Sequence, residues 1–371
     1  MIYLDYQATT PLAPEAREAM IPWLAGPEAP GASDWSRTQA CGWANPHSPH
    51  RYGRAAAAAV EVARAQVAAL FPAGGRVVFT SGATEALNLA IIGSGRKSLA
   101  VSAIEHSAVL DTARFVDPGL GVLPVSGDGL VDPDTALPDG SAMVAVMQVN
   151  NEIGTVQPVE AIAARAHENG ALFLCDAVQS AGKLAAPEGA DMIAVSSHKL
   201  YGPKGIGALW VRDGLDLQPL IHGGGQEGGL RSGTLSPALC AGFGAAAALC
   251  TSLGASDAQH VEKLWTLARS LFAEWTLNGS AEARWHGNLN VRLAGLDVGR
   301  LLSECRNVAF SAGSACASGS GRPSHVLRAL GLSDSDSKTA IRLGFGRYTR
   351  EDELNEAAAA IHAAARSQGV L

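Results

Sequence analysis

The central part of the chain alternates short apolar runs with amphipathic stretches. Six such runs lie between residues 76 and 211, and segments with helical periodicity separate them. They are Val77–Phe79, Leu99–Val101, Met143–Val149, Leu172–Leu174, Met192–Val195 and Ala208–Val211. Strands that alternate with helices in this way favour a mostly parallel sheet with helices on both faces. The pattern therefore predicts an α/β fold.

Helical patterns also flank this region. Residues 55–70 are Ala-rich with apolar residues at helical spacing, which predicts a helix before the sheet. The last third predicts a smaller α+β domain, with three helices and one strand. Its helices are expected at about 237–253, 257–277 and 351–366, and its strand at 289–293. Residues 26–49 are rich in Gly, Pro, Ser and Asn, which predicts a surface excursion.

Composition narrows the possible functions. The chain has 371 residues, 47% of them hydrophobic and 17% charged, which is enough apolar material for a two-domain globular protein. Its net charge of -7 and the absence of a basic run argue against nucleic acid as a partner. The start, Met1–Tyr6, has no leader-like pattern, and no run of 18 apolar residues occurs. We expect a cytoplasmic protein that does not bind membranes.

The six cysteines have no C-x-x-C spacing, which argues against a disulfide framework and against a metal site. Cys175, Cys240 and Cys250 lie in apolar strand or helix patterns and are expected to behave as small hydrophobic residues. Cys316 differs, because the segment 311–321 around it consists almost entirely of Gly, Ala and Ser. We predict an exposed thiol on a flexible loop.

Polar residues follow five of the predicted strands. They are Ser81–Glu85, Glu105–His106, Asn150–Asn151, Asp176 with Gln179, and His198–Lys199. Because the carboxyl ends of parallel strands meet at one edge of a sheet, these residues are expected to converge on one crevice. Each motif alone also fits a structural role, as a helix cap or a packed histidine.

The residue types suggest the chemistry of a phosphorylated ring cofactor. A small-residue turn before a helix, as at Ser81–Glu85, suits a phosphate. Asp176 can pair with a protonated pyridine nitrogen, and Lys199 among small residues can form a Schiff base. His106 can stack on a flat ring and move protons near neutral pH.

Together these motifs strongly resemble the NifS/IscS-type cysteine desulfurases, which use pyridoxal 5'-phosphate. The motifs are Ser81–Glu85, Glu105–His106, Asn150–Gly154, Asp176–Gln179, Ser197–Lys199, Arg231–Thr234 and Gly313–Cys316. The resemblance implies a fold-type I transferase and a homodimer, with a mostly parallel seven-stranded sheet in the large domain. It places the large domain at 11–250, and a small α+β domain with the mobile cysteine loop at 1–10 and 251–371.

The same resemblance implies roles for individual residues. Lys199 would bind the cofactor covalently, Asp176 would pair with its pyridine nitrogen, Gln179 would face its phenolic oxygen and His106 would stack on its ring. The phosphate would be held by Ala83, Thr84, Ser196 and His198, and by Thr234 of the neighbouring subunit. Asn151 would contact the cofactor and, with Arg342, the substrate carboxylate.

The activity implied is removal of sulfur from L-cysteine, giving L-alanine and a persulfide on Cys316. A sulfur-acceptor or scaffold protein would receive the sulfur for iron–sulfur cluster assembly or thio-cofactor synthesis. Two alternatives stay open: a different enzyme on this fold, such as a small-substrate aminotransferase or a selenocysteine lyase, and a silent interaction protein. Cys316 argues against transamination, which needs no thiol, and the presence of Lys199, Asp176 and His106 argues against a silent protein.

Overall fold

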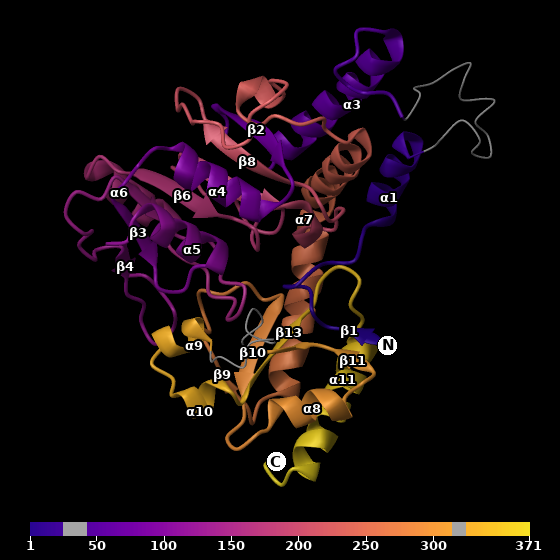
Figure 1. Ribbon diagram of the computed structural model, residues 1–371. Coiled ribbons are helices and arrows are strands. Elements are labelled where there is room, and N and C mark those ends of the chain that lie inside the picture. Colours follow the sequence, from indigo (N-terminus) through magenta and orange to yellow (C-terminus); the bar gives the residue numbers. More distant parts are fainter. Residues whose placement is uncertain (25–42, 314–323) are drawn as a thin grey trace.

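The computed structural model describes residues 1–24, 43–313 and 324–371 (Figure 1). Most of the predicted surface excursion at 26–49 lies outside the described residues. The predicted loop around Cys316 also lies outside them, apart from its first residues, Ser311–Gly313.

A seven-stranded sheet forms the centre of the larger part of the molecule. Its order is β2-β8-β7-β6-β5-β3-β4, and only β8 runs antiparallel to its neighbours. The strands are β2 (Gly75–Thr80), β8 (Gly207–Arg212), β7 (Met192–Ser196), β6 (Leu172–Asp176), β5 (Met143–Ala145), β3 (Leu99–Ser102) and β4 (Gly121–Leu123). The predicted mostly parallel seven-stranded sheet is therefore confirmed. The apolar runs did not reveal β4, a three-residue edge strand.

Alternate residues of these strands enter two different cores, which explains why the strands read as continuous apolar runs. Phe173 packs in the core on one face of the sheet and Leu174 in the core on the other. The first face is covered by α3 (Arg51–Ala68), α6 (Val159–Glu168) and part of α7 (Pro237–Leu271). The second face is covered by α4 (Ala83–Gly93) and α5 (Ser107–Val116) (Figure 1).

Helix α7 corrects one prediction. The two helices expected at about 237–253 and 257–277 form one helix that ends at Leu271, and Thr276–Leu277 is strand β9. The continuous helix packs in the core of the large sheet through Phe243 and in a second core through Leu264. Packing at both ends therefore outweighs the weak helix propensity of Gly254 between them.

By length and composition α7 is the one described helix that could cross a membrane. Its apolar residues Cys240, Phe243 and Ala247 are buried in the core of the large sheet, as in the core helix of a globular protein.

A smaller antiparallel sheet, of order β12-β13-β10-β9, organises the other core. Its remaining strands are β10 (Asn288–Arg292), β12 (Ser311–Ala312) and β13 (Ala340–Gly344). The helices around it are α8 (Val298–Glu304), α9 (His325–Ala329), α10 (Asp334–Ser337) and α11 (Glu351–Ser367). Near the N-terminus, β1 (Ile2–Tyr3) pairs with β11 (Val308–Ala309) beside this sheet, and α1 (Pro14–Met20) follows (Figure 1).

We propose a large domain at 11–250 and a small domain at 1–10 and 251–371. Two observations support this division. Ile2 and Leu4 pack in the same core as Leu264 and Leu343, and this core is separate from the two that cover the large sheet.

Candidate active site

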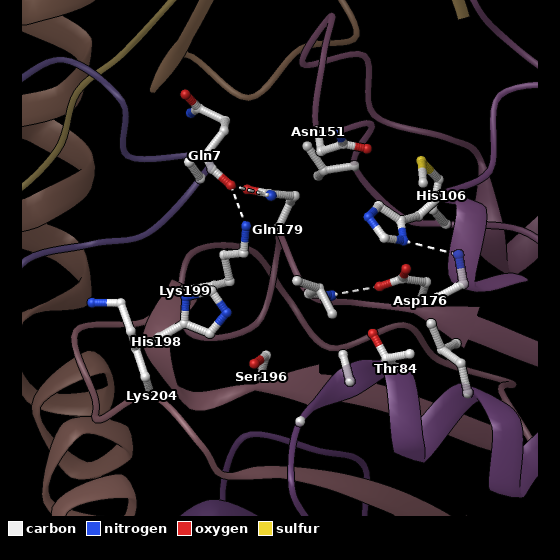
Figure 2. A pocket seen from close by; sticks show the side chains of 18 of the residues that line it. Gln7, Thr84, His106, Asn151, Asp176, Gln179, Ser196, His198, Lys199 and Lys204 are labelled. Carbon is white, nitrogen blue, oxygen red and sulfur yellow. Dashed lines mark hydrogen bonds between the residues drawn. The ribbon is translucent and has the colours of Figure 1, made fainter. Parts of the chain in front are cut away.

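One cavity of about 680 Å³ opens at the carboxyl ends of the parallel strands (Figure 2). Ten of the predicted site residues line it. They are Ala83, Thr84, His106, Asn151, Asp176, Gln179, Ser196, His198, Lys199 and Arg342. The structure thus brings together residues that are scattered between positions 83 and 342.

Two predicted site residues are not in this group. Thr234 is exposed and does not line the cavity, and Cys316 lies outside the described residues. The described cysteines, Cys175, Cys240, Cys250 and Cys305, are all buried. Burial raises the pKa of each thiol, which makes these four cysteines poor nucleophiles.

The N-terminus of α4 forms one wall of the cavity. No side chain among the described residues caps this helix, so the amides of its first turn, at Ala83 and Thr84, are available to a ligand. The Glu85 carboxylate instead accepts from Ser81 N–H at 2.7 Å. A Cβ on Gly207 would lie 2.7 Å from the Gly82 backbone, so glycine allows β8 to pack against this turn.

Lys199 lies in a short 3-10 turn, Ser197–Lys199, directly after β7. Its Nζ donates a hydrogen bond to the main-chain oxygen of Gln7 (Figure 2). Gln179 Nε2 donates to the same oxygen at 3.0 Å. The sequence interpretation missed Gln7, which lies in an irregular segment with no periodic signal.

His198 lies beside Lys199 in the chain, and the distance between its Nδ1 and Thr9 Oγ1 is 3.1 Å. Burial, and then the charges of Lys199 and Lys204, lower the pKa of His198 to about 4. The ring is therefore neutral at physiological pH and offers a hydrogen bond rather than a charge.

Asp176 ends β6 and is almost fully buried. Its Oδ1 accepts from Val178 N–H at 2.9 Å. Burial raises the pKa of Asp176, while that hydrogen bond and the charges of His106 and Lys199 act in the opposite direction. A buried carboxyl group of this kind is stabilised as an anion by a cationic N–H partner.

His106 is the N-cap of α5, and its Nδ1 accepts from Ala108 N–H at 3.1 Å (Figure 2). In the neutral ring the proton is therefore on Nε2. The preceding Glu105 is completely buried, and its Oε1 accepts from Ser102 Oγ and, at 2.9 Å, from Met147 N–H. Burial raises the pKa of Glu105 to about 8, although the sequence motifs assign this residue no role of its own.

Arg342, on β13, brings a buried guanidinium into the cavity from the small sheet. Its Nη1 donates to Asn151 O at 3.0 Å, and its Nη2 donates to Asp5 Oδ1 at 2.7 Å and to Ser311 Oγ at 3.3 Å. Its Nε is buried with no hydrogen-bond partner among the described residues. The arginine is thus held in place with its Nε donor left for a ligand. Asp5 and Ser311 are further residues that the sequence interpretation missed.

Fold and site together define a class of protein. The family model described as aminotransferase class-V matches residues 2–356, and the chain belongs to this family. Its sequence is 40% identical to the cysteine desulfurase IscS of Rickettsia rickettsii (strain Iowa), over 96% of this chain and 89% of the relative. The cysteine desulfurase IscS of Rickettsia conorii (strain ATCC VR-613 / Malish 7) is equally similar, at 40% over the same shares.

Solved structures agree with this assignment. The NifS-like protein from Rickettsia africae ESF-5 superimposes with a TM-score of 0.86 and 26% identity, covering 99% of both chains. SspA in complex with cysteine superimposes with a TM-score of 0.79 and 35% identity, covering 94% of this chain and 100% of the other.

Proposed function

We propose that this protein is a cysteine desulfurase that takes sulfur from L-cysteine, releases L-alanine and holds the sulfur as a persulfide on Cys316. The observation that carries the proposal is the convergence of Lys199, Asp176 and Arg342 on one cavity. These residues offer an amine for covalent capture, a buried carboxyl group and a buried guanidinium. The resemblance to proteins named cysteine desulfurase supports the same conclusion.

The residues of the cavity fit pyridoxal 5'-phosphate, on which this family depends. The uncapped N-terminus of α4 suits the phosphate, and we assign Ala83, Thr84, Ser196 and His198 to it. Asp176 suits the protonated pyridine nitrogen, because the carboxyl group is buried without a cationic hydrogen-bond donor among the described residues.

Three further residues complete the proposed binding set. We assign Gln179 to the phenolic oxygen, since its amide Oε1 is buried without a partner among the described residues. We assign His106 and Asn151 to the ring, because both line the cavity and His106 lies beside Asp176 (Figure 2).

When bound, this cofactor supplies an electron sink that allows the Cα–H bond of an amino acid to ionise. Lys199 holds the cofactor and then serves as the base that takes the Cα proton. Arg342 and Asn151 bind the substrate carboxylate, and the buried Nε of Arg342 is a donor available for it. His106 lines the cavity with its Nδ1 held by Ala108 N–H, so its Nε2 is the atom through which it can exchange a proton during sulfur removal.

Cys316 carries the sulfur-transfer step. Its thiolate attacks the substrate sulfur, so that an S–S bond forms and the Cβ–S bond breaks. The electron pair of the broken bond stays with the carbon, which takes up a proton. One L-cysteine and one enzyme thiol thus give one L-alanine and one enzyme persulfide, without an external oxidant or reductant.

The proposed function also involves a second subunit and a partner protein. We propose a homodimer in the cytoplasm, in which Thr234 of each subunit contacts the phosphate in the neighbouring site. The exposure of Thr234 leaves it accessible to a second subunit. A sulfur-acceptor or scaffold protein would then take the persulfide sulfur for iron–sulfur cluster assembly or thio-cofactor synthesis.

The test of the proposed function is a substitution of Cys316, the residue proposed to take the sulfur from the substrate. In Cys316→Ser we expect alanine and sulfide production to fall by about 100-fold or more, because a hydroxyl is a far weaker nucleophile at neutral pH. L-Cysteine should still change the absorbance of the bound cofactor in this variant, and mass spectrometry should find one extra sulfur on the Cys316 peptide of the wild type.

Cys41→Ser is the matched control and should keep wild-type turnover. An undiminished rate in Cys316→Ser would contradict the persulfide step and favour a lyase that acts directly on the substrate.

A further inference from the structure

The turn that carries Lys199 has an unusual backbone. The main-chain oxygen of Ser197 accepts the N–H groups of both Leu200 and Gly202 at 3.0 Å, which closes the turn tightly. Within it, the buried Tyr201 has φ 68°, in the left-handed region that an aromatic residue seldom adopts. Contacts from outside the turn must therefore hold this conformation.

Thr10, from the N-terminal segment, supplies such contacts. Its N–H and its hydroxyl both donate to the main-chain oxygen of His198, at 2.9 and 3.0 Å. Its hydroxyl also accepts from Tyr201 N–H at 2.7 Å. One hydroxyl group thus binds the backbone on both sides of Lys199.

The position of Thr10 indicates that its hydroxyl has a structural role and does not contact a ligand in the cavity. Thr10 is only 4% exposed, and it does not line the cavity. The main-chain oxygen of Tyr201 accepts from Ala13 N–H at 2.9 Å, so the same N-terminal segment runs along the whole turn. This segment also provides the Gln7 carbonyl that accepts from Lys199 Nζ.

We propose that Thr10 is a positioning residue for Lys199, because its hydroxyl fixes residues 198–201 in the conformation that directs the lysine into the cavity. The proposal rests on the proposed role of Lys199 as the residue that binds the cofactor. Thr10 itself touches neither substrate nor cofactor.

Thr10→Val tests this directly, since valine keeps the shape of threonine and removes the hydroxyl. The buried Tyr201 N–H then loses its acceptor, and the strained turn can relax. Because a misplacement of about 1 Å can cost up to about 100-fold in rate, we expect cofactor-free Thr10→Val to capture pyridoxal 5'-phosphate at least about tenfold more slowly than wild type. Thr10→Ser restores the hydroxyl and should stay within about threefold of wild type.

Thr155→Val is the matched control. Thr155 is also fully buried, and its hydroxyl donates to Asp128 O at 3.0 Å and accepts from Ser280 N–H at 3.2 Å. It does not line the cavity. This variant should therefore lose thermal stability as Thr10→Val does, yet capture the cofactor at the wild-type rate.

Capture is measured on cofactor-free protein by absorbance, and borohydride reduction followed by mass spectrometry gives the fraction of modified Lys199. Capture by Thr10→Val at the wild-type rate, or equal slowing in Thr155→Val, would overturn the positioning role alone. If the wild type captures no pyridoxal 5'-phosphate, the proposed function fails and the positioning role with it. If Thr10→Val does not fold, Thr10→Ala is compared with Thr10→Ser by the same criteria.

Discussion

At the scale of single residues, the site depends on main-chain groups as much as on side chains. Lys199 Nζ and Gln179 Nε2 share the Gln7 carbonyl, and Arg342 donates to the Asn151 carbonyl. A main-chain acceptor cannot be lost by mutation of its own side chain. The charged groups of the site are therefore held in part by main-chain acceptors, although side chains also accept hydrogen bonds from Arg342.

Removal of the Lys199 amine should abolish covalent binding of the cofactor. In Lys199→Ala we expect no borohydride-reducible adduct with pyridoxal 5'-phosphate and turnover lowered by about 100-fold or more, because the amine is the proposed covalent anchor and base. Absorbance and mass spectrometry after reduction measure this. Lys263→Ala, on the exposed side of α7, is the control with an intact adduct, and a retained adduct in Lys199→Ala would contradict the assignment.

Glu105 should make stability depend on pH. Burial raises the pKa of Glu105 from 4.5 to about 8. Between pH 4.5 and about pH 8 the folded protein therefore binds one more proton than the unfolded chain does. Its contribution is thus fully present below about pH 4.5 and is lost as pH rises through about 8. Glu105→Gln keeps the shape without the titration, and its stability relative to wild type should rise by on the order of a few kcal/mol between pH 5 and pH 8.

Denaturant unfolding of both proteins across this pH range measures the effect. Glu188→Gln, at an exposed position, should follow the wild-type curve. Parallel curves for wild type and Glu105→Gln would show that Glu105 ionises normally.

At the scale of elements, strands β6 and β7 deliver their reactive residues at their carboxyl ends. Asp176 is the last residue of β6, and Lys199 follows β7 by three residues. The antiparallel β8 returns behind them and packs its Gly207 against the turn before α4. Helix α7 joins the two parts of the molecule, because its first half packs in the core of the large sheet and its second half in the small core.

Two glycines of α7 should respond in opposite ways to alanine. A Cβ on Gly254 meets nothing within 4 Å, so Gly254→Ala should raise the free energy of unfolding by about 0.5–1 kcal/mol through helix propensity. A Cβ on Gly244 would lie 2.7 Å from the Ala63 backbone of α3, so Gly244→Ala should lower the free energy of unfolding by about 1–3 kcal/mol. Thermal and denaturant unfolding measure both, and equal effects would refute the packing described for α7.

At the scale of the whole molecule, the cavity lies where the two sheets meet. Asp176 and Lys199 come from the large sheet, and Arg342 comes from the small one. The N-terminal segment connects them, since Asp5 pairs with Arg342 at 2.7 Å and Thr10 binds the turn that carries Lys199. A movement of one part relative to the other would therefore change the separation of the proposed cofactor-binding and carboxylate-binding groups.

The proposed dimer leads to a complementation test. If Thr234 serves the neighbouring site, mixing Thr234→Ala subunits with Lys199→Ala subunits should create one intact site per heterodimer. With random mixing half of the dimers are mixed, and each has one good site of two, so activity should return to about a quarter of the wild-type value. Mixing either variant with itself is the control, and no recovery after verified subunit exchange would count against a shared site.

The sequence by itself determined the fold class and most of the cavity. Continuous apolar runs identify strands buried on both faces, and polar residues after those strands identify the edge at which Asp176, Lys199 and His106 meet. Such signals are local, because each depends on the few residues around one strand end. The match of these residues to a known family then added Arg342, which no periodicity would have selected.

Only the tertiary structure decided which distant groups hold these residues in place. Gln7 is 192 positions from Lys199, and Asp5 is 337 positions from Arg342. Thr10 has no local signal, and the sequence marks Glu105 only as a polar residue after a strand, since their roles depend on partners or burial that only the folded chain creates. The continuity of α7 across Gly254 was decided in the same way, because packing against two separate cores contributes more free energy than one unfavourable helix residue costs.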